Sequence, residues 1–272
     1  MFSTYRPTPD VHVVTTTAEI PLLGSLAINA FVLDGPEPML VDAGPVASRD
    51  EFMTSLRTVI DPTELRWLWL THTDYDHIGA IPQLLAENPA LRIITTFVGV
   101  GIMGLSSSPL PMDRVHFLNA GDTATFGHRT VTAYKPPAFD NPITTGFFDH
   151  TSGSLFSSDC FGALLTDVPT DATQIPPADL HSGQVFWTTI DSAWLHQIDR
   201  DILTANIDAT RRIEPAIVFS SHLPAAPGHL LPALLDAIDA VPDAPHFSAP
   251  DQATLEQMLT TMTGPAAPAE TD

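Results

Sequence analysis

The feature that most constrains this chain is a short run of histidines and aspartates between His72 and His77. Residues 70–79 read Leu-Thr-His-Thr-Asp-Tyr-Asp-His-Ile-Gly. The apolar segment 65–71 predicts a buried strand, and 79–88 predicts a helix that ends before Pro89. Neutral imidazoles and carboxylates are the donors that divalent iron, manganese and zinc prefer. The sequence therefore predicts a metal site in a strand-to-helix loop.

The composition narrows the class of protein. The chain has 272 residues with 44% hydrophobic composition, enough to bury a sizeable core, and we expect a single domain over 1–262. The formal net charge of -21 opposes binding to phosphate backbones and anionic lipid headgroups, so we expect neither nucleic acid nor a membrane as a partner. No apolar stretch could span a membrane and no signal segment opens the chain, so the expected location is cytoplasmic. The single cysteine, Cys160, excludes an intrachain disulfide and a cysteine-only metal cluster.

Apolar runs separated by turn residues predict many strands and few long helices. Residues 26–33 and 38–43 predict a hairpin around Asp34-Gly35, and the capping-box spacing from Ser48 predicts a helix to about Ile60. Further strands are expected at 91–98, 114–118, 122–126, 129–134, 143–148, 154–158 and 216–220, and further helices at 192–212, 230–241 and 251–262.

Two segments show no regular period. Residues 163–190 are rich in Pro, Asp and Thr and are expected to form a lid-like insertion. The acidic end, 263–272, is expected to be a disordered tail.

The sequence Gly-x-Gly-x-x-Gly at 99–104 matches a dinucleotide fingerprint in form, but the prolines that follow exclude the long helix that such a site requires.

Other segments place further metal-ligand residue types just after predicted strands. Residues 39–44 read Met-Leu-Val-Asp-Ala-Gly and contain Asp42, and 155–162 read Leu-Phe-Ser-Ser-Asp-Cys-Phe-Gly and contain Asp159. Residues 218–224 read Val-Phe-Ser-Ser-His-Leu-Pro and contain His222. A carboxylate can bridge two cations in a way that imidazole cannot.

In their order along the chain and in their positions after predicted strands, these segments resemble the metallo-β-lactamase fold superfamily. The motif loop is similar to its His-x-His-x-Asp-His signature, with Asp74 in place of the second histidine. Together with the strand around Asp159, this places the resemblance closest to the flavodiiron and oxygen-binding diiron branch. The resemblance implies an α/β (α+β) fold, a four-layer αββα sandwich with the ligands in loops at one edge.

The resemblance also implies a role for each site residue. Asp159 is the expected bridge between the metals, and Asp42 is expected to support a motif histidine from behind. Asp74 and Asp76 are the expected catalytic carboxylates. The full set of expected metal ligands is His72, Asp74, Asp76, His77, Asp159 and His222.

One expected ligand is missing. The family holds one metal through the first two motif positions, a mid-chain histidine and the bridge, but alignment of 138–141 places Pro137 or a neighbour at that histidine. His150, His181 and His196 are the histidines that could compensate. Asp76, His77, Asp159 and His222 complete the second position, so the expectation is one metal there, or an uneven pair.

The resemblance and the carboxylate-rich site favour a non-haem iron oxidoreductase with one or two iron ions, which binds or reduces dioxygen or oxidises a small organic substrate. Zinc or manganese is the alternative metal, and a zinc hydrolase of an ester, thioester, lactone or phosphoester is the alternative function. A degenerate scaffold is a third reading. No FMN or NAD is expected on this chain, so an external electron donor is expected, and relatives of this branch suggest a homodimer.

Overall fold

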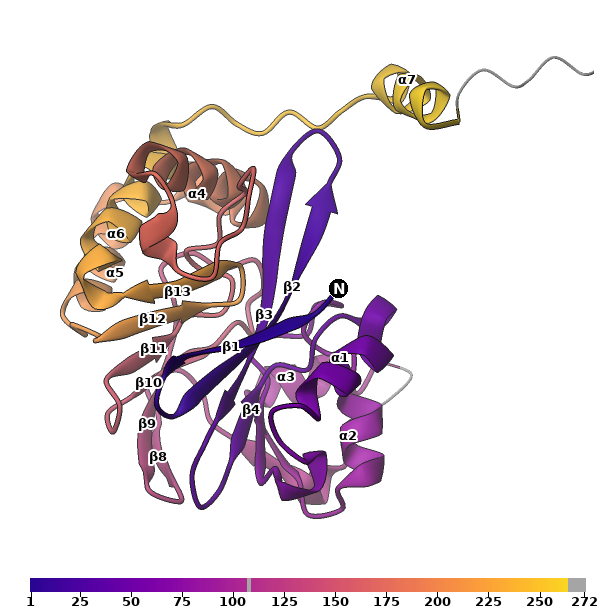
Figure 1. The fold of residues 1–272 in the computed structure, drawn as a ribbon. Coiled ribbons are helices and arrows are strands. Elements are labelled where there is room, and N and C mark those ends of the chain that lie inside the picture. The colour runs from indigo at the N-terminus through magenta and orange to yellow at the C-terminus, as the bar shows by residue number, and fades with distance from the viewer. Residues whose placement is uncertain (107–108, 264–272) are drawn as a thin grey trace, which may run out of the picture.

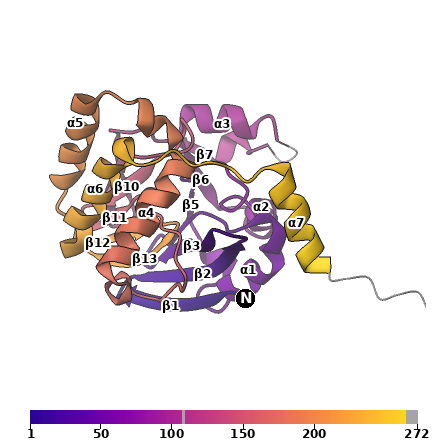
Figure 2. The same ribbon diagram turned by 90° about the horizontal axis from the view of Figure 1, so that it is seen from above.

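The computed structural model describes residues 1–106 and 109–263, the last three of them by their backbone alone. The expected tail therefore lies outside the described residues, apart from the backbone of Thr263. Figures 1 and 2 show two sheets packed face to face, with helices on both outer sides.

The first sheet has the strand order β1-β2-β3-β4-β5-β6-β7. Its first strands pair antiparallel, and pairing becomes parallel from β4 onward. The β4 and β5 side chains are all buried, as expected for central parallel strands. The strands are β1 (Ser3–Thr8), β2 (Val11–Ile20), β3 (Gly24–Leu33), β4 (Met39–Val41), β5 (Trp67–Trp69), β6 (Arg92–Thr95) and β7 (Val115–Phe117).

The second sheet has the order β13-β12-β11-β10-β9-β8. Its pairs are antiparallel except for β11 with β12, which run parallel. The strands are β8 (Thr123–Phe126), β9 (Arg129–Tyr134), β10 (Gly146–Asp149), β11 (Ser154–Phe156), β12 (Ile217–Ser220) and β13 (Leu223–Pro227).

The helices divide between the two outer faces, with α1, α2 and α3 beside the first sheet and α4, α5 and α6 beside the second (Figure 1). The α-helices are α1 (Arg49–Leu56), α2 (Ile81–Glu87), α3 (Phe97–Met103), α4 (Pro177–Asp191), α5 (Arg200–Arg211), α6 (Leu231–Ala240) and α7 (Gln252–Thr263). Short 3₁₀ helices are η1 (Val46–Ser48), η2 (Pro62–Glu64), η3 (Met112–Arg114), η4 (Ala172–Gln174), η5 (Ala193–Gln197), η6 (Gly228–Leu230) and η7 (Val241–Asp243).

The buried apolar residues form separate clusters between successive layers. One cluster joins α1 and α2 to the first sheet, and another joins α4, α5 and α6 to the second. The third lies between the sheets, where Phe156 stacks on Phe147 and Phe219 at ring-centroid distances of 4.5 and 4.9 Å. This arrangement confirms the expected four-layer αββα sandwich.

Helix α4 differs from the irregular segment expected at 163–190. Its N-terminal half packs Leu180 into the core beneath α6, and Gly183 lies so close to Leu164 that an added Cβ would come within 2.3 Å of the Leu164 carbonyl oxygen. Much of its buried face is polar or small, including Gln184 and Thr188, so an apolar period does not reveal the helix. The single-domain organisation and the lid role of this segment stay predictions.

Other elements also lay outside the sequence expectations. Strands β1, β2 and β13 and helix α3 were not predicted, and the expected strand 91–98 ends at Thr95 because Thr96 caps α3 by accepting from the Gly99 N–H. Among the described residues, no helix combines the length and apolar character needed to cross a membrane.

Candidate metal centre

The predicted site residues lie where strands end, at one edge of the sandwich. Asp42 follows β4 and the motif loop follows β5, so both come from the first sheet. Asp159 follows β11 and His222 lies between β12 and β13, so both come from the second sheet. The site therefore spans the two sheets.

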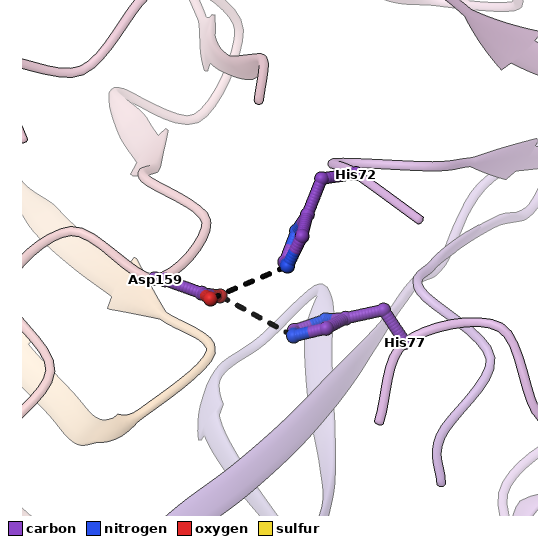
Figure 3. A group of neighbouring side chains, drawn as sticks. All are labelled: His72, His77 and Asp159. Atoms are coloured by element: carbon purple, nitrogen blue, oxygen red, sulfur yellow. Dashed lines mark ion pairs between the residues drawn. The ribbon is translucent and has the colours of Figure 1, made fainter. Parts of the chain in front are cut away.

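Asp159 lies at the centre of this arrangement and faces different histidines with its two carboxylate oxygens. Its Oδ1 lies 3.3 Å from Nε2 of His77 and 3.4 Å from Nε2 of His222. Its Oδ2 lies 3.3 Å from Nε2 of His72 (Figure 3). A carboxylate with one oxygen toward each of two donor sets has the orientation of a metal bridge.

Several of these donor atoms are buried and make no hydrogen bond. They are Nε2 of His72, Nε2 of His77 and Oδ1 of Asp159. Both histidine side chains are fully buried, and burying a polar atom without a partner costs free energy. The pairs approach closely without hydrogen-bond geometry, which is the pattern expected where a cation belongs between them. The residues present therefore fit a metal.

Hydrogen bonds behind the rings point the correct nitrogen inward. Nδ1 of His77 lies 2.9 Å from Oδ2 of Asp42, and Nδ1 of His222 lies 2.7 Å from the Ala27 carbonyl oxygen. Both partners accept, so Nδ1 carries the proton in each ring and the Nε2 lone pair is free to bind a metal.

Asp42 also fixes the start of the motif loop. It accepts hydrogen bonds from the Thr71 N–H at 2.9 Å and from the Thr71 hydroxyl at 2.8 Å. Asp42 itself has a φ of 60°, a left-handed conformation that costs a residue with a side chain some strain. The hydroxyls of Thr71 and Ser158 contact Nδ1 of His72 at 3.1 and 3.2 Å.

Asp76 joins the second position. Its Oδ2 lies 3.3 Å from Nε2 of His77 and 3.5 Å from Nε2 of His222. The structure therefore brings Asp76, His77 and His222 together around Oδ1 of Asp159.

The electrostatics of the site favour a cation. Burial opposes the charged form of His222, but Asp159 and Asp76 outweigh it and raise the pKa of His222 to about 9. Burial likewise opposes charge on His77, while Asp76, Asp159 and Asp42 raise the pKa of His77 well above its ordinary value. Burial works against the charged carboxylate of Asp159, yet the three histidines hold its pKa well below the ordinary value. Positive charge is therefore stabilised at the point where the donors converge.

Asp74 lies at the open side of the first position and is exposed. One of its oxygens lies within 4.8 Å of ligand atoms of His72 and Asp140. Partial burial, followed by the nearby carboxylates Asp140, Asp159 and Asp76, raises the pKa of Asp74 despite the opposing effect of His72.

The structure brings in Asp140 and Asp191, which the sequence analysis did not assign to the site. Oδ2 of Asp140 lies 3.8 Å from Nε2 of His72, and ligand atoms of Asp140, Asp159 and Asp191 lie within 4.8 Å of one another. Burial, together with Asp159 and Asp140, raises the pKa of Asp191 to about 7. Neither residue lies in one of the recognised motifs. Asp140 does lie within 138–141, the segment that aligns with the family's mid-chain histidine region.

None of the three histidines considered as replacements joins a candidate metal group within the described residues. His150 is exposed and pairs with the Thr132 hydroxyl at 2.8 Å. His196 stacks on His246 with ring centroids 3.9 Å apart. His181 is exposed on α4.

Cys160 is buried in the core, and burial raises the pKa of its thiol, so it packs as a neutral side chain.

Comparison with known proteins agrees with this geometry. Residues 26–193 match the family described as ODP family beta lactamase. The chain is 28% identical over 157 residues to putative diflavin flavoprotein A 1 of Thermosynechococcus vestitus, covering 57% of this chain and 27% of that protein. It is 27% identical over 148 residues to rubredoxin-oxygen oxidoreductase of Megalodesulfovibrio gigas, covering 54% of this chain and 37% of that protein. The chain thus matches only about a third of the length of these relatives.

Solved structures share the fold. Rubredoxin oxygen:oxidoreductase from Desulfovibrio gigas superposes with a TM-score of 0.72 at 18% identity, covering 89% of this chain and 61% of that one. A fragment of putative diflavin flavoprotein A 5 from Nostoc sp. PCC 7120 gives 0.71 at 12% identity, covering 95% and 98%. The predicted resemblance to the flavodiiron branch of the metallo-β-lactamase fold is confirmed.

Proposed function

This chain belongs to the ODP beta-lactamase family, and from that premise we propose that it binds a pair of non-haem iron ions and reduces dioxygen or nitric oxide. The observation that carries the proposal is the orientation of Asp159, whose two oxygens face separate histidine sets. Names among the relatives, rubredoxin-oxygen oxidoreductase and nitric oxide reductase, support the reaction class.

Each position would draw on its own residues. The second would use Asp76, His77, His222 and Oδ1 of Asp159, and the first would use His72, Asp74 and Oδ2 of Asp159. Iron in such a carboxylate-rich site supplies one-electron redox chemistry and open coordination positions for a small diatomic molecule.

The protein's own groups prepare that chemistry. Asp42 and the Ala27 carbonyl hold the rings of His77 and His222, so the donor nitrogens need not reorganise when a metal binds. Asp74 is exposed, so its carboxylate would hold the first-position metal from the solvent side of the site.

We propose that the electrons come from an external donor, and the name of the M. gigas relative, rubredoxin-oxygen oxidoreductase, suggests rubredoxin or a protein like it. The homodimer and the cytoplasmic location belong to the same proposal, and oxidation of a small organic substrate is the alternative use of the site.

The test is gas consumption by the iron-loaded full chain. The protein is reduced chemically, the excess reductant is removed, and dioxygen or nitric oxide uptake is followed with an electrode. We expect uptake in proportion to bound iron, and its loss in the variant His77→Ala. The control His150→Ala changes an exposed histidine outside the site and should behave as wild type. A zinc-loaded protein that hydrolyses esters and takes up neither gas would contradict the proposal.

A further inference from the structure

The first metal position lacks a histidine, and carboxylates face the space where one would be needed. His72 supplies the one imidazole, and its Nε2 lies 3.8 Å from Oδ2 of Asp140. Asp74 also offers an oxygen within 4.8 Å of both. The donors at this position are therefore mostly oxygen atoms.

Asp191 approaches the same space from a different element. It is the last residue of α4, and one of its oxygens lies within 4.8 Å of ligand oxygens of Asp140 and Asp159. A carboxylate at a helix C-terminus is disfavoured by the helix dipole, and two neighbouring carboxylates repel it further. A cation among them would remove both costs.

An independent observation shows that this space is built for a ligand. The His72 side chain is fully buried and its Nε2 makes no hydrogen bond, although Asp140 and Asp159 both lie within 4 Å. A buried imidazole nitrogen directed at carboxylates without bonding to them is a donor without a partner. His72 and Asp74 form one candidate metal group with Asp140, and Asp191 forms another with Asp140 and Asp159, so Asp140 is common to both groups.

The loop that carries Asp140 is held firmly. The Thr144 hydroxyl donates to Oδ1 of Asp140 at 3.0 Å, so the other oxygen is left to face His72. The Lys135 ammonium donates to the carbonyl oxygens of Pro142 and Thr144, each at 3.0 Å, and the Thr145 N–H donates to the Thr71 carbonyl oxygen at 2.8 Å. These contacts tie the Asp140 loop to the motif loop.

We propose that Asp140 and Asp191 are metal ligands that complete the first position in place of the missing mid-chain histidine. The proposal rests on the proposed two-metal function. It makes the positions unequal, since the first would have one imidazole and several carboxylates and the second has two imidazoles. Because carboxylate oxygens suit hard cations, the first position should accept Mn²⁺ or Fe²⁺ readily and show less preference for Zn²⁺.

The test is titration of the metal-free full chain with Mn²⁺, with free and bound ion followed by electron paramagnetic resonance. Wild-type protein should bind two ions and show the signal of a coupled pair. Asp140→Asn and Asp191→Asn keep the side-chain shape but weaken one ligand, so each should bind the first-position ion at least about tenfold more weakly. The coupled signal should then give way to that of an isolated ion.

Matched controls separate this inference from the proposed function. Asp179→Asn changes an exposed aspartate on the same helix and should leave both ions bound, and His77→Ala should weaken the other ion. Circular dichroism checks that each variant is folded. If Asp140→Asn and Asp191→Asn bind two ions as wild type does, or if wild type binds one ion that depends on His77 alone, the inference is wrong although a metal site stands. If wild type binds no metal, the proposed function fails with it.

Discussion

At the scale of single residues, the site depends as much on the groups behind the histidines as on the histidines. The Asp42 carboxylate touches Nδ1 of His77 and both the backbone and hydroxyl of Thr71. Among the described residues, Asp42 belongs to none of the candidate metal groups. It nevertheless sets which nitrogen of His77 carries the proton and fixes the path of the motif loop.

Replacing Asp42 by Asn should weaken metal binding at the second position by roughly 10- to 100-fold, because the amide is a poorer acceptor for the His77 ring. Titration of metal-free protein with Fe²⁺ or Mn²⁺ measures the change. Asp113→Asn, an exposed aspartate in η3, should bind as wild type does. Unchanged affinity in Asp42→Asn would show that the Asp42 contact does not support the ring.

The raised pKa of His222 predicts how the stability of metal-free protein depends on pH. A histidine whose folded pKa is about 9, against an ordinary value of 6.5, contributes stability that is fully present below about pH 6.5. That contribution is lost as the pH rises through about 9, and His77 shifts in the same direction. Because a metal binds only the neutral imidazoles, the stability of metal-loaded protein relative to metal-free protein should rise over this pH range.

Thermal unfolding between pH 6 and 9 tests this behaviour. The melting temperature of chelator-treated protein should fall with rising pH, and the gap to metal-loaded protein should widen. A metal-free melting temperature that rises across the same window would contradict the assignment of protonated rings.

At the scale of elements, α4 is the element whose position most affects the site. Leu180 belongs to the core cluster that joins α4 to α6, and Gly183 lies against the Leu164 carbonyl oxygen in the segment after β11. The Gln184 side chain donates to the Leu234 carbonyl oxygen at 2.7 Å. The same helix ends at Asp191 beside the candidate metal centre. Packing at its middle therefore sets the place of a carboxylate at its end.

Helical glycines offer a matched test. In Gly183→Ala the new Cβ would lie 2.3 Å from the Leu164 carbonyl oxygen, so α4 must shift, and stability and first-position Mn²⁺ binding should both fall. In Gly101→Ala, on α3, the Cβ meets nothing within 4 Å, and helix propensity should add up to about 1 kcal/mol. Denaturant unfolding of both variants measures the difference. Equal effects of the two substitutions would mean that α4 is not closely packed at Gly183.

Much of the site could be read from the sequence because its residues follow strands in short, recognisable segments. His72 to His77, Asp159 and His222 each sit at a strand end where the apolar run stops, and the structure brings them together. Asp140 and Asp191 could not be found this way. Asp140 lies in a loop stabilised by Lys135 and Thr144 contacts, and Asp191 lies on a helix whose buried face contains glycine, glutamine and threonine. Tertiary packing, rather than local pattern, places both.

At the scale of the whole molecule, the candidate centre joins the two halves of the sandwich. His72 and His77 come from the first sheet, and Asp159 and His222 come from the second. The aromatic core between the sheets therefore sets the distance between the donor sets. Bound metal should in turn hold the sheets together and stabilise the fold by mass action.

Phe156 tests this dependence because it stacks on Phe147 and Phe219 and lies at the end of β11, just before Asp159. Phe156→Ala should lower the free energy of unfolding by about 3–5 kcal/mol. Phe97→Ala, at a side chain with 70% exposure, should change it by less than about 0.5 kcal/mol. Denaturant unfolding of metal-free protein gives both values. A small loss at Phe156 would mean that the sheets are not held by this core.

The most direct test of the two-metal account is the metal content of the full chain by elemental analysis, after expression with added iron. We predict two irons per chain in wild type and a loss of both in Asp159→Ala, because the bridging carboxylate serves each position. The same analysis on Phe97→Ala should return the wild-type value. Stoichiometric zinc from iron-supplemented cells, or iron that survives Asp159→Ala undiminished, would contradict the account.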